Sequence, residues 1–320
     1  MPKPIKTHKI SLALQGGGAH AAFSWGVIDQ LLQNESTEIE AISATSGGAM
    51  LAVVMAQGMM EGGREGARDA LLKFWRKANI AAGLLPIRTT IADKFLGNVG
   101  LDLSPSTVAL DMLTKMFSPY QFNLFDINPM KSIIEEMVDF KVLNKKSPLA
   151  LYINTTHART GKSRIFDHSE ISLDAVMASS CLPYIFRTVE IEGEPYWDGS
   201  FSACPALAPL VGSGRDIVLV EVHPHYVEEI PTAAADILDR MTEISFTAAQ
   251  LSEMRAIEQY NNMIESGVLK QKPITIHRVE AQDILLGLGR SSKLNLEWSF
   301  LMYLHDTGIQ AATDWLEKRR

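Results

Sequence analysis

The fold of this chain is decided at residues 40–49, where the sequence is EAISATSGGA. An apolar, strand-like run ends at Ser46, two glycines follow, and an apolar run typical of a helix comes next. This order predicts a nucleophile elbow, a sharp strand-to-helix turn that strains a serine and exposes its hydroxyl oxygen. Strand and helix backbones pass close together at such a turn, so Ala44, Gly47 and Gly48 need to be small. A serine N-cap at an ordinary βα turn has a similar sequence, so this motif alone does not establish catalysis.

A second glycine-rich turn lies near the N-terminus. Residues 10–14 (ISLAL) predict a short buried strand that leads directly into three glycines at 16–18. Apolar residues at helical spacing from 21 to 32 then predict a partly buried helix. Consecutive glycines allow backbone N–H groups to point toward one centre, and such an arrangement binds an anion. The anion could be a nucleotide phosphate or the oxyanion of an acyl-transfer intermediate.

The nucleotide alternative rests on Gly16, Gly18 and Ala21, whose spacing matches a relaxed dinucleotide-binding fingerprint. In that fingerprint an acidic residue at the end of the second strand binds the ribose. Here Glu38 and Glu40 precede the second strand as the sequence predicts it, and the serine elbow occupies the end of that strand. Acyl transfer therefore explains the two glycine-rich turns better.

A serine nucleophile needs a base, and the sequence favours an aspartate over a histidine. None of the eight histidines has the context of a catalytic base. His20 lies inside the glycine loop, where it could contact substrate or cap a turn, and His223 follows a predicted strand. Asp198 stands between an aromatic pair and Gly199. A carboxylate beside a hydroxyl in a poorly solvated site has a raised pKa and can accept a proton, although an Asp-Gly hairpin turn is the alternative here.

Taken together, the three motifs resemble those of the patatin-like phospholipase family. Their order along the chain is a glycine loop at 16–18, a serine elbow at 45–48 and an Asp-Gly-Ser motif at 198–200. Residues 173–186 are similar to the segment that leads to the catalytic aspartate in that family. The resemblance implies an α/β fold with three layers, α/β/α, around a mainly parallel central sheet.

The resemblance also implies a function, that of a serine lipid acyl hydrolase which cleaves carboxylic ester bonds of (phospho)lipids. Ser46 and Asp198 would be its catalytic dyad, and the reaction would pass through an acyl-enzyme with no catalytic histidine, cofactor or metal. Four glycines are implied in the oxyanion hole and substrate contact: Gly16, Gly17, Gly18 and Gly47. Four further residues are implied to support the site: Ala44, Gly48, Gly199 and His20.

Several positions depart from the family's usual pattern. Ala44 opens the elbow where glycine is usual, and His20 and Ala21 replace a basic residue and a glycine after the loop. Ser200 stands where Gly or Ala is usual, and Cys204 replaces an asparagine. None of these changes removes a nucleophile or a carboxylate. They leave two alternatives open, a non-catalytic lipid- or partner-binding protein on the same fold and an acyltransferase.

Composition agrees with one globular domain over residues 1–320. No linker or low-complexity segment divides the chain, and a net charge of −7 disfavours nucleic-acid binding. We expect a lipid or ester substrate with at most transient contact to a membrane surface, because no apolar run reaches the length of a membrane span. No signal peptide is recognised, and two cysteines are too few for a disulfide scaffold, so we expect a cytoplasmic protein without a metal site.

Alternating strand and helix patterns fill the rest of the chain. Further strands are predicted at 149–155, 189–191, 216–222 and 273–279, and further helices at 68–77, 129–138, 233–266 and 311–318. Apolar residues of the helix at 233–266, among them Ile237, Met241 and Ile244, are expected to pack into the core. Residues 78–129 are the least regular part, an insertion that could cover the site, meet lipid or form a helical subdomain.

Overall fold

The structure, a computed structural model, describes residues 7–83, 109, 112–114, 116–211, 216–280, 284, 288 and 290–319. Its centre is a sheet of eight strands in this part of the chain, in the order β5-β6-β3-β2-β1-β7-β8, with β4 paired to β3. The strands are β1 (His8–Leu14), β2 (Thr37–Ala44), β3 (Ala150–His157), β4 (Ser163–Asp167), β5 (Val189–Ile191), β6 (Glu194–Asp198), β7 (Asp216–Glu221) and β8 (Ile276–Glu280). Neighbours from β3 to β8 along this order pair in parallel, whereas β4, β5 and β6 join antiparallel.

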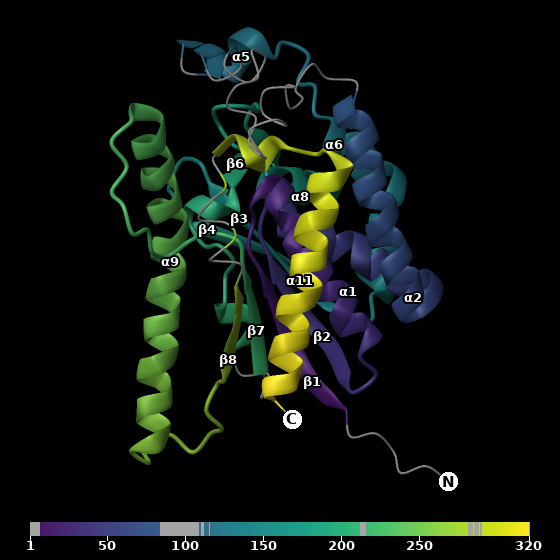
Figure 1. The fold of residues 1–320 in the computed structure, drawn as a ribbon, viewed down its shortest axis with the longest axis vertical. Coiled ribbons are helices and arrows are strands. Elements are labelled where there is room, and N and C mark those ends of the chain that lie inside the picture. The colour runs from purple at the N-terminus through teal and green to yellow at the C-terminus, as the bar shows by residue number, and fades with distance from the viewer. Residues whose placement is uncertain are drawn as a thin grey trace.

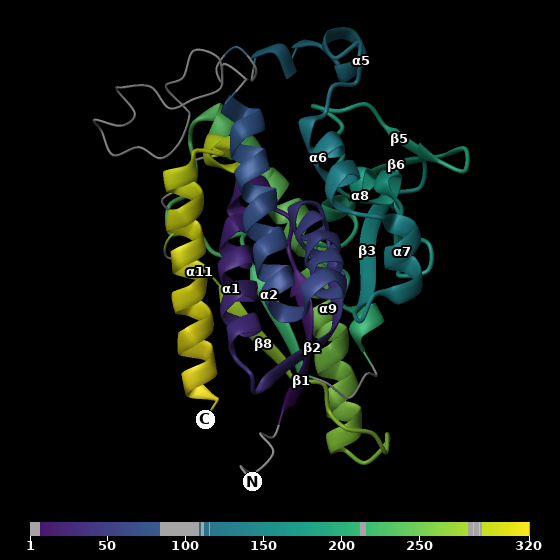
Figure 2. The same cartoon turned by 90° about the vertical axis from the view of Figure 1, so that its right-hand side faces the viewer.

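Helices cover both faces of the sheet. They are α1 (Ala21–Gln33), α2 (Gly47–Gly83), α5 (Pro119–Phe122), α6 (Pro129–Met137), α7 (Phe140–Lys146), α8 (Leu173–Ser179), α9 (Ala234–Glu265) and α11 (Trp298–Lys318). Figures 1 and 2 show α1, α2 and α11 on one side of the sheet and the long helix α9 on the other. The core between the sheet and α1, α2 and α11 is the larger of the two, and a smaller one lies toward α9. The predicted three-layer α/β fold is therefore confirmed.

The register of the parallel strands places the site. Leu14 at the end of β1 pairs with Ala44 at the end of β2 and with Val220 of β7. The carboxyl ends of these strands therefore lie side by side. Loops that follow such strands meet at one edge of the sheet, where α/β proteins bind their ligands.

Most predicted elements agree with the observed ones to within a few residues. The two apolar runs after Ser46 belong to one helix, α2, which is broken at Gly62 and Gly63, where the backbone leaves helical geometry. The C-terminal helix α11 begins at Trp298, well before the predicted start at 311, and it contacts α1 closely through glycines on both helices.

The segment around Asp198 differs from the hairpin alternative. Residues Glu194–Asp198 form β6, which pairs with β5, and the hairpin turn lies before it at Glu192 and Gly193, both with positive φ. Asp198 therefore ends a strand instead of forming a turn between two strands. The strand β4 and the helix α7 were not expected, because their short patterns are weak signals.

Helix α9 contradicts the expected packing along its first half. Ile237, Met241 and Ile244 are exposed, whereas Met254 and Ile257 in the second half pack against the sheet. The helix extends past the carboxyl ends of the strands, where no sheet remains for its apolar residues to cover (Figure 1).

The predicted insertion at 78–129 lies in large part outside the described residues, and its role stays a prediction. So does the assignment of residues 1–320 to a single domain. Within the described residues, no helix is both long and apolar enough to cross a bilayer.

Candidate active site

Ser46 occupies the turn between β2 and α2. Its backbone has a φ of 55°, a left-handed conformation that costs free energy for a residue with a Cβ atom. The backbone N–H of Ser46 donates a hydrogen bond to Oγ of Ser179, at the end of α8, over 2.9 Å. The side chain is half-buried, and α2 begins at the next residue. The strained turn is thus held from a neighbouring helix.

The elbow is packed so tightly that its small residues are required. A Cβ atom at Gly48 would lie 2.7 Å from the carbonyl oxygen of Leu14 and 2.8 Å from that of Gln15. Ala44, which replaces the usual glycine, is fully buried within the core and contributes its methyl group to it. The added methyl therefore fits at Ala44, whereas none fits at Gly48.

The glycine loop lies directly against the elbow. A Cβ atom at Gly16 would lie 2.5 Å from Cβ of Ser46 and 3.3 Å from Oγ of Ser200. A Cβ atom at Gly47 would lie 3.3 Å from the carbonyl oxygen of Gly18, whose φ is 58°. The three predicted motifs therefore meet at one place although they are far apart in the sequence.

Gln15 fixes the start of the glycine loop, and the sequence did not single it out. Its fully buried side chain accepts hydrogen bonds from the backbone N–H groups of Val222 (2.7 Å) and His223 (3.0 Å). Its amide nitrogen donates to Gln250 of α9 over 2.6 Å, and Gln250 in turn donates to Glu221 over 2.8 Å. A buried amide with all these partners holds the loop against β7 and α9.

Asp198 is the buried carboxylate of the site. Burial raises its pKa to about 6, and hydrogen bonds from the Ser200 backbone, the Ser200 side chain and the Ser46 side chain oppose that rise. The bond from the Ser200 backbone N–H to Oδ1 is 2.8 Å long. Asp198 is therefore a carboxylate beside the Ser46 hydroxyl, with a pKa close enough to neutral to exchange a proton.

The backbone of Asp198 is held on both sides. Its N–H donates to the carbonyl of Cys181, and its carbonyl accepts from Oγ1 of Thr156, each over 2.8 Å. Nδ2 of Asn154 donates to the carbonyl of Gly199, also over 2.8 Å, and backbone atoms of Asn154 leave no room for a Cβ there. The close approach of the Asn154 backbone explains why glycine follows the aspartate.

The histidines near the site are neutral. Burial and then the nearby Lys293 lower the pKa of His20 to about 3, and its Nε2 hydrogen bonds with Oγ of Ser292 over 2.8 Å. Burial likewise lowers the pKa of His223, whose ring packs edge-on against Phe246 with centroids 5.7 Å apart. His20 thus contacts the segment at 290–294. Its neutral side chain stands at a position where the family usually has a basic residue.

The positioning residues missed from the sequence share a property. Gln15, Ser179 and Asn154 are polar and fully buried, and each bonds to a segment distant in sequence. The sequence signals for them were weak: Gln15 lies next to the glycine loop, and Ser179 lies within the segment 173–186 that resembles the family. Both cysteines are free and buried, and within the described residues no group of three His, Cys, Asp or Glu side chains is placed to hold a metal.

The comparisons with known proteins identify the family of this chain. A family model described as patatin-like phospholipase matches residues 12–210, which contain the glycine loop, Ser46 and Asp198. The chain therefore belongs to the patatin-like phospholipase family, as its motifs predicted. A search of curated proteins gave no match.

Two solved bacterial structures are similar at a coarse level. VipD from Legionella pneumophila is 14% identical with a TM-score of 0.39, and the match covers 95% of this chain and 67% of VipD. ExoU, solved with SpcU from the type III secretion system of Pseudomonas aeruginosa, is 13% identical with a TM-score of 0.33, over 96% of this chain. The match spans only 53% of the ExoU chain. At these scores the likenesses add nothing to the assignment by family.

Proposed function

We propose that this protein is a serine acyl hydrolase that cleaves carboxylic ester bonds of lipids, phospholipids among them, through a Ser46–Asp198 dyad. One observation carries the proposal. A serine in a strained left-handed conformation lies beside a buried carboxylate, Asp198, whose pKa is raised by burial to about 6. The family is one of lipid hydrolases, and both residues lie in the matched region.

The first chemical step is attack by Ser46. Ionised Asp198 accepts the hydroxyl proton while Oγ bonds to the ester carbonyl carbon, and the carbonyl oxygen becomes an oxyanion. The N–H groups of the glycine loop and of Gly47 are the donors proposed for that oxyanion, and the positive end of α2 adds to their effect. Protonated Asp198 then returns the proton to the leaving alcohol, which gives an acyl-enzyme.

Water completes the cycle in a second addition and elimination, in which water is the nucleophile and Ser46 is the leaving group. Asp198 takes a proton from water, hydroxide adds to the acyl-enzyme, and the carboxylic acid leaves as Ser46 recovers its proton. Burial lowers the pKa of His20 to about 3 and that of His223 well below its ordinary value, so both rings are weak bases, and Nε2 of His20 is already hydrogen bonded to Ser292. Asp198 is therefore the proposed base.

A labelling experiment tests the nucleophile. A fluorophosphonate probe should modify the wild-type protein, and Ser46→Ala should abolish both labelling and ester turnover, by at least ~10³-fold for turnover. Ser169→Ala, which removes a serine from an exposed turn, is the matched control and should be labelled like wild type. Labelling of Ser46→Ala at the wild-type level would exclude Ser46 as the nucleophile.

A substrate panel refines the proposal. Hydrolysis of p-nitrophenyl esters of increasing chain length, followed by phosphatidylcholine and lysophosphatidylcholine, defines the acyl length and the head group. Acyl transfer is distinguished from hydrolysis by adding an alcohol acceptor and measuring whether the ester product replaces the free acid.

A further inference from the structure

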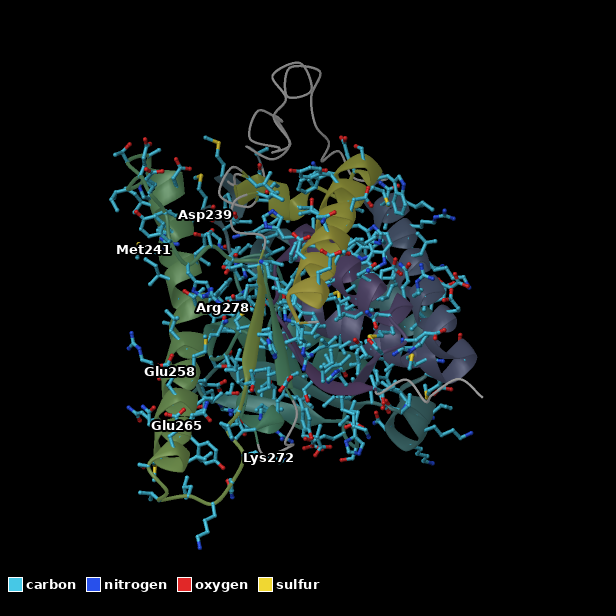
Figure 3. The ribbon with its side chains drawn as sticks, turned by 60° about the horizontal axis from the view of Figure 1, so that its bottom comes forward. Asp239, Met241, Glu258, Glu265, Lys272 and Arg278 are labelled. Atoms are coloured by element: carbon cyan, nitrogen blue, oxygen red, sulfur yellow. The ribbon has the colours of Figure 1, made fainter. Side chains whose placement is uncertain are left out.

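The first half of α9 and the segment before it carry an exposed apolar surface. Ile237, Met241 and Ile244 recur at helical spacing on one side of α9, and Met241 is 61% exposed. Figure 3 shows Met241 on the side of α9 that faces away from the sheet. Tyr226 and Ile230, 63% and 78% exposed, extend this surface along the preceding segment. We call these five residues the α9 patch.

The α9 patch is hollowed. A pocket of about 400 Å³ lies between the helix and the segment before it, lined by all five patch residues together with Val227. Large exposed apolar surfaces of this kind mark interaction sites in soluble proteins. His225, Pro231 and Arg240 complete the wall, whose surface is mostly aliphatic and aromatic and suits an alkyl chain.

The α9 patch lies at the same end of the molecule as Ser46. Phe246, two residues after the last patch residue, packs against Phe201 with ring centroids 5.1 Å apart, and Phe201 belongs to the turn that follows Asp198. The first half of α9 lies beyond the carboxyl ends of the strands in both views (Figures 1 and 2). A surface that meets the patch therefore also faces the proposed site.

A second exposed apolar group lies at this end, around α5. It consists of Met116, Phe117, Tyr120, Leu124, Phe125 and Ile127. Phe125 is 87% exposed, and Tyr120 is anchored by a hydrogen bond from the Thr188 backbone N–H to its hydroxyl. Figures 1 and 2 both place α5 at the end where the first half of α9 lies. Two apolar groups on one end fit a broad apolar partner better than a single peptide.

The charges around the α9 patch define the partner further. Glu228, Glu229 and Asp236 are acidic residues next to the patch in sequence, and one cation, Arg240, lines the same pocket. Arg240 donates to the backbone carbonyls of Pro224 and His225, and it pairs with Glu243. The acidic residues are repelled by anionic lipid, and Arg240 is already paired within the protein and needs no acidic group from a partner.

We propose that the α9 patch, aided by the apolar group around α5, docks this end of the protein on the surface of a lipid layer whose zwitterionic head groups carry no net charge. The inference rests on the proposed function, since a lipid ester must leave such a layer to reach Ser46. Apolar side chains that enter the boundary between head groups and acyl chains give affinity in proportion to the area they bury.

Flotation with phosphatidylcholine vesicles tests this surface. Met241→Ser combined with Ile244→Ser should lower the vesicle partition coefficient by about tenfold or more. The matched control, Met263→Ser combined with Val268→Ser, removes exposed apolar groups at the opposite end of α9 and should bind like wild type. Both double variants should hydrolyse a short soluble ester at the wild-type rate, which shows that they are folded.

Four results would overturn the proposal. They are no binding of wild type to phosphatidylcholine vesicles, equal binding by both double variants, binding only when phosphatidylglycerol is added, and a wild-type dimer that the Met241/Ile244 variant dissociates. Ser46→Ala separates this proposal from the proposed function. This variant should float with vesicles like wild type while it loses ester hydrolysis. Vesicle binding can therefore be judged even if the proposed catalytic function is wrong.

Discussion

The elbow region and the first half of α9 are opposites in packing. Around Ser46 the backbone segments are so close that glycine loop, elbow and Asp198 turn leave no space for extra atoms. Along the first half of α9, large apolar side chains lie open to solvent. The elbow region is organised by contacts within the chain, whereas the first half of α9 presents apolar groups that the described part of the chain does not cover.

The largest expected effect concerns the proposed base in the elbow region. Asp198→Asn keeps the shape and the hydrogen bond from the Ser200 backbone, but the amide cannot accept the Ser46 proton. We expect turnover of a p-nitrophenyl ester to fall by about 10³-fold with an unchanged circular dichroism spectrum. His223→Ala is the comparison variant and should retain most activity. Equal losses in the two folded proteins would favour a histidine base.

The raised pKa of Asp198 also predicts how activity and the stability of the Asp198→Asn variant depend on pH. Activity needs the ionised carboxylate, so the wild-type rate should fall as the pH drops below about 6. Burial raises this pKa above its ordinary value of 3.8, so ionised Asp198 destabilises the fold above pH 6, and the penalty vanishes as the pH falls toward 3.8. Asp198→Asn should therefore exceed wild type in Tm at pH 8 and approach it at pH 4. A Tm difference that grows on acidification would contradict this sign.

The next effect tests how strictly the elbow excludes atoms. Gly16→Ala places a Cβ where it meets Cβ of Ser46 at 2.5 Å, so the glycine loop must move. Displacement of proposed oxyanion donors should lower kcat by about 10²-fold. Gly62→Ala is the control, because a Cβ there meets nothing within 4 Å and the φ of −149° is open to alanine. Normal kinetics in Gly16→Ala would show that the loop has more freedom than its contacts indicate.

Much of the site was predictable because its chemistry is local. The turn at Ser46 needs a strand, a serine and small neighbours within one short stretch, and the glycine loop is equally compact. Their meeting followed from the order of parallel strands, since β1 and β2 are adjacent and end at one edge. Asp198 was found by its neighbours and by resemblance, not by periodicity, because β6 is short and antiparallel.

The partners of these residues were not predictable by the same reasoning. Gln15 bonds to Gln250 and Ser46 bonds to Ser179 across large separations in sequence, and no local pattern carries that information. The packing predicted for the first half of helix α9 was wrong for a similar reason. Its apolar spacing predicts an apolar face, but the length of the sheet beneath it decides which part of that face is covered.

A stability measurement sharpens this contrast within α9 itself. Ile257 is 7% exposed and packs on the sheet, so Ile257→Ala should lower the free energy of unfolding by about 2 to 4 kcal/mol. Ile244→Ala removes the same atoms from an exposed position and should change it by less than about 0.5 kcal/mol. Urea unfolding measures both. Similar losses would mean that the first half of α9 is covered within the folded chain.

The smallest expected effect concerns Ala44, where the elbow departs from the family's glycine. The methyl group lies in the core at the end of β2, where Ala44 pairs with Leu14 of β1, and Gly47 and Gly48 provide the small residues that the turn needs next to Ser46. Ala44→Gly removes one buried methyl group, which costs about 1 kcal/mol of stability, and it leaves the nucleophile, carboxylate and loop in place. Ester turnover should therefore change by about tenfold or less, equivalent to about 1.4 kcal/mol in the barrier. Steady-state kinetics on a short p-nitrophenyl ester, with Ser46→Ala as the zero-activity reference, measures the change. If wild type is neither labelled nor active and Ala44→Gly gains both properties, the natural chain is a non-catalytic member that retains the fold.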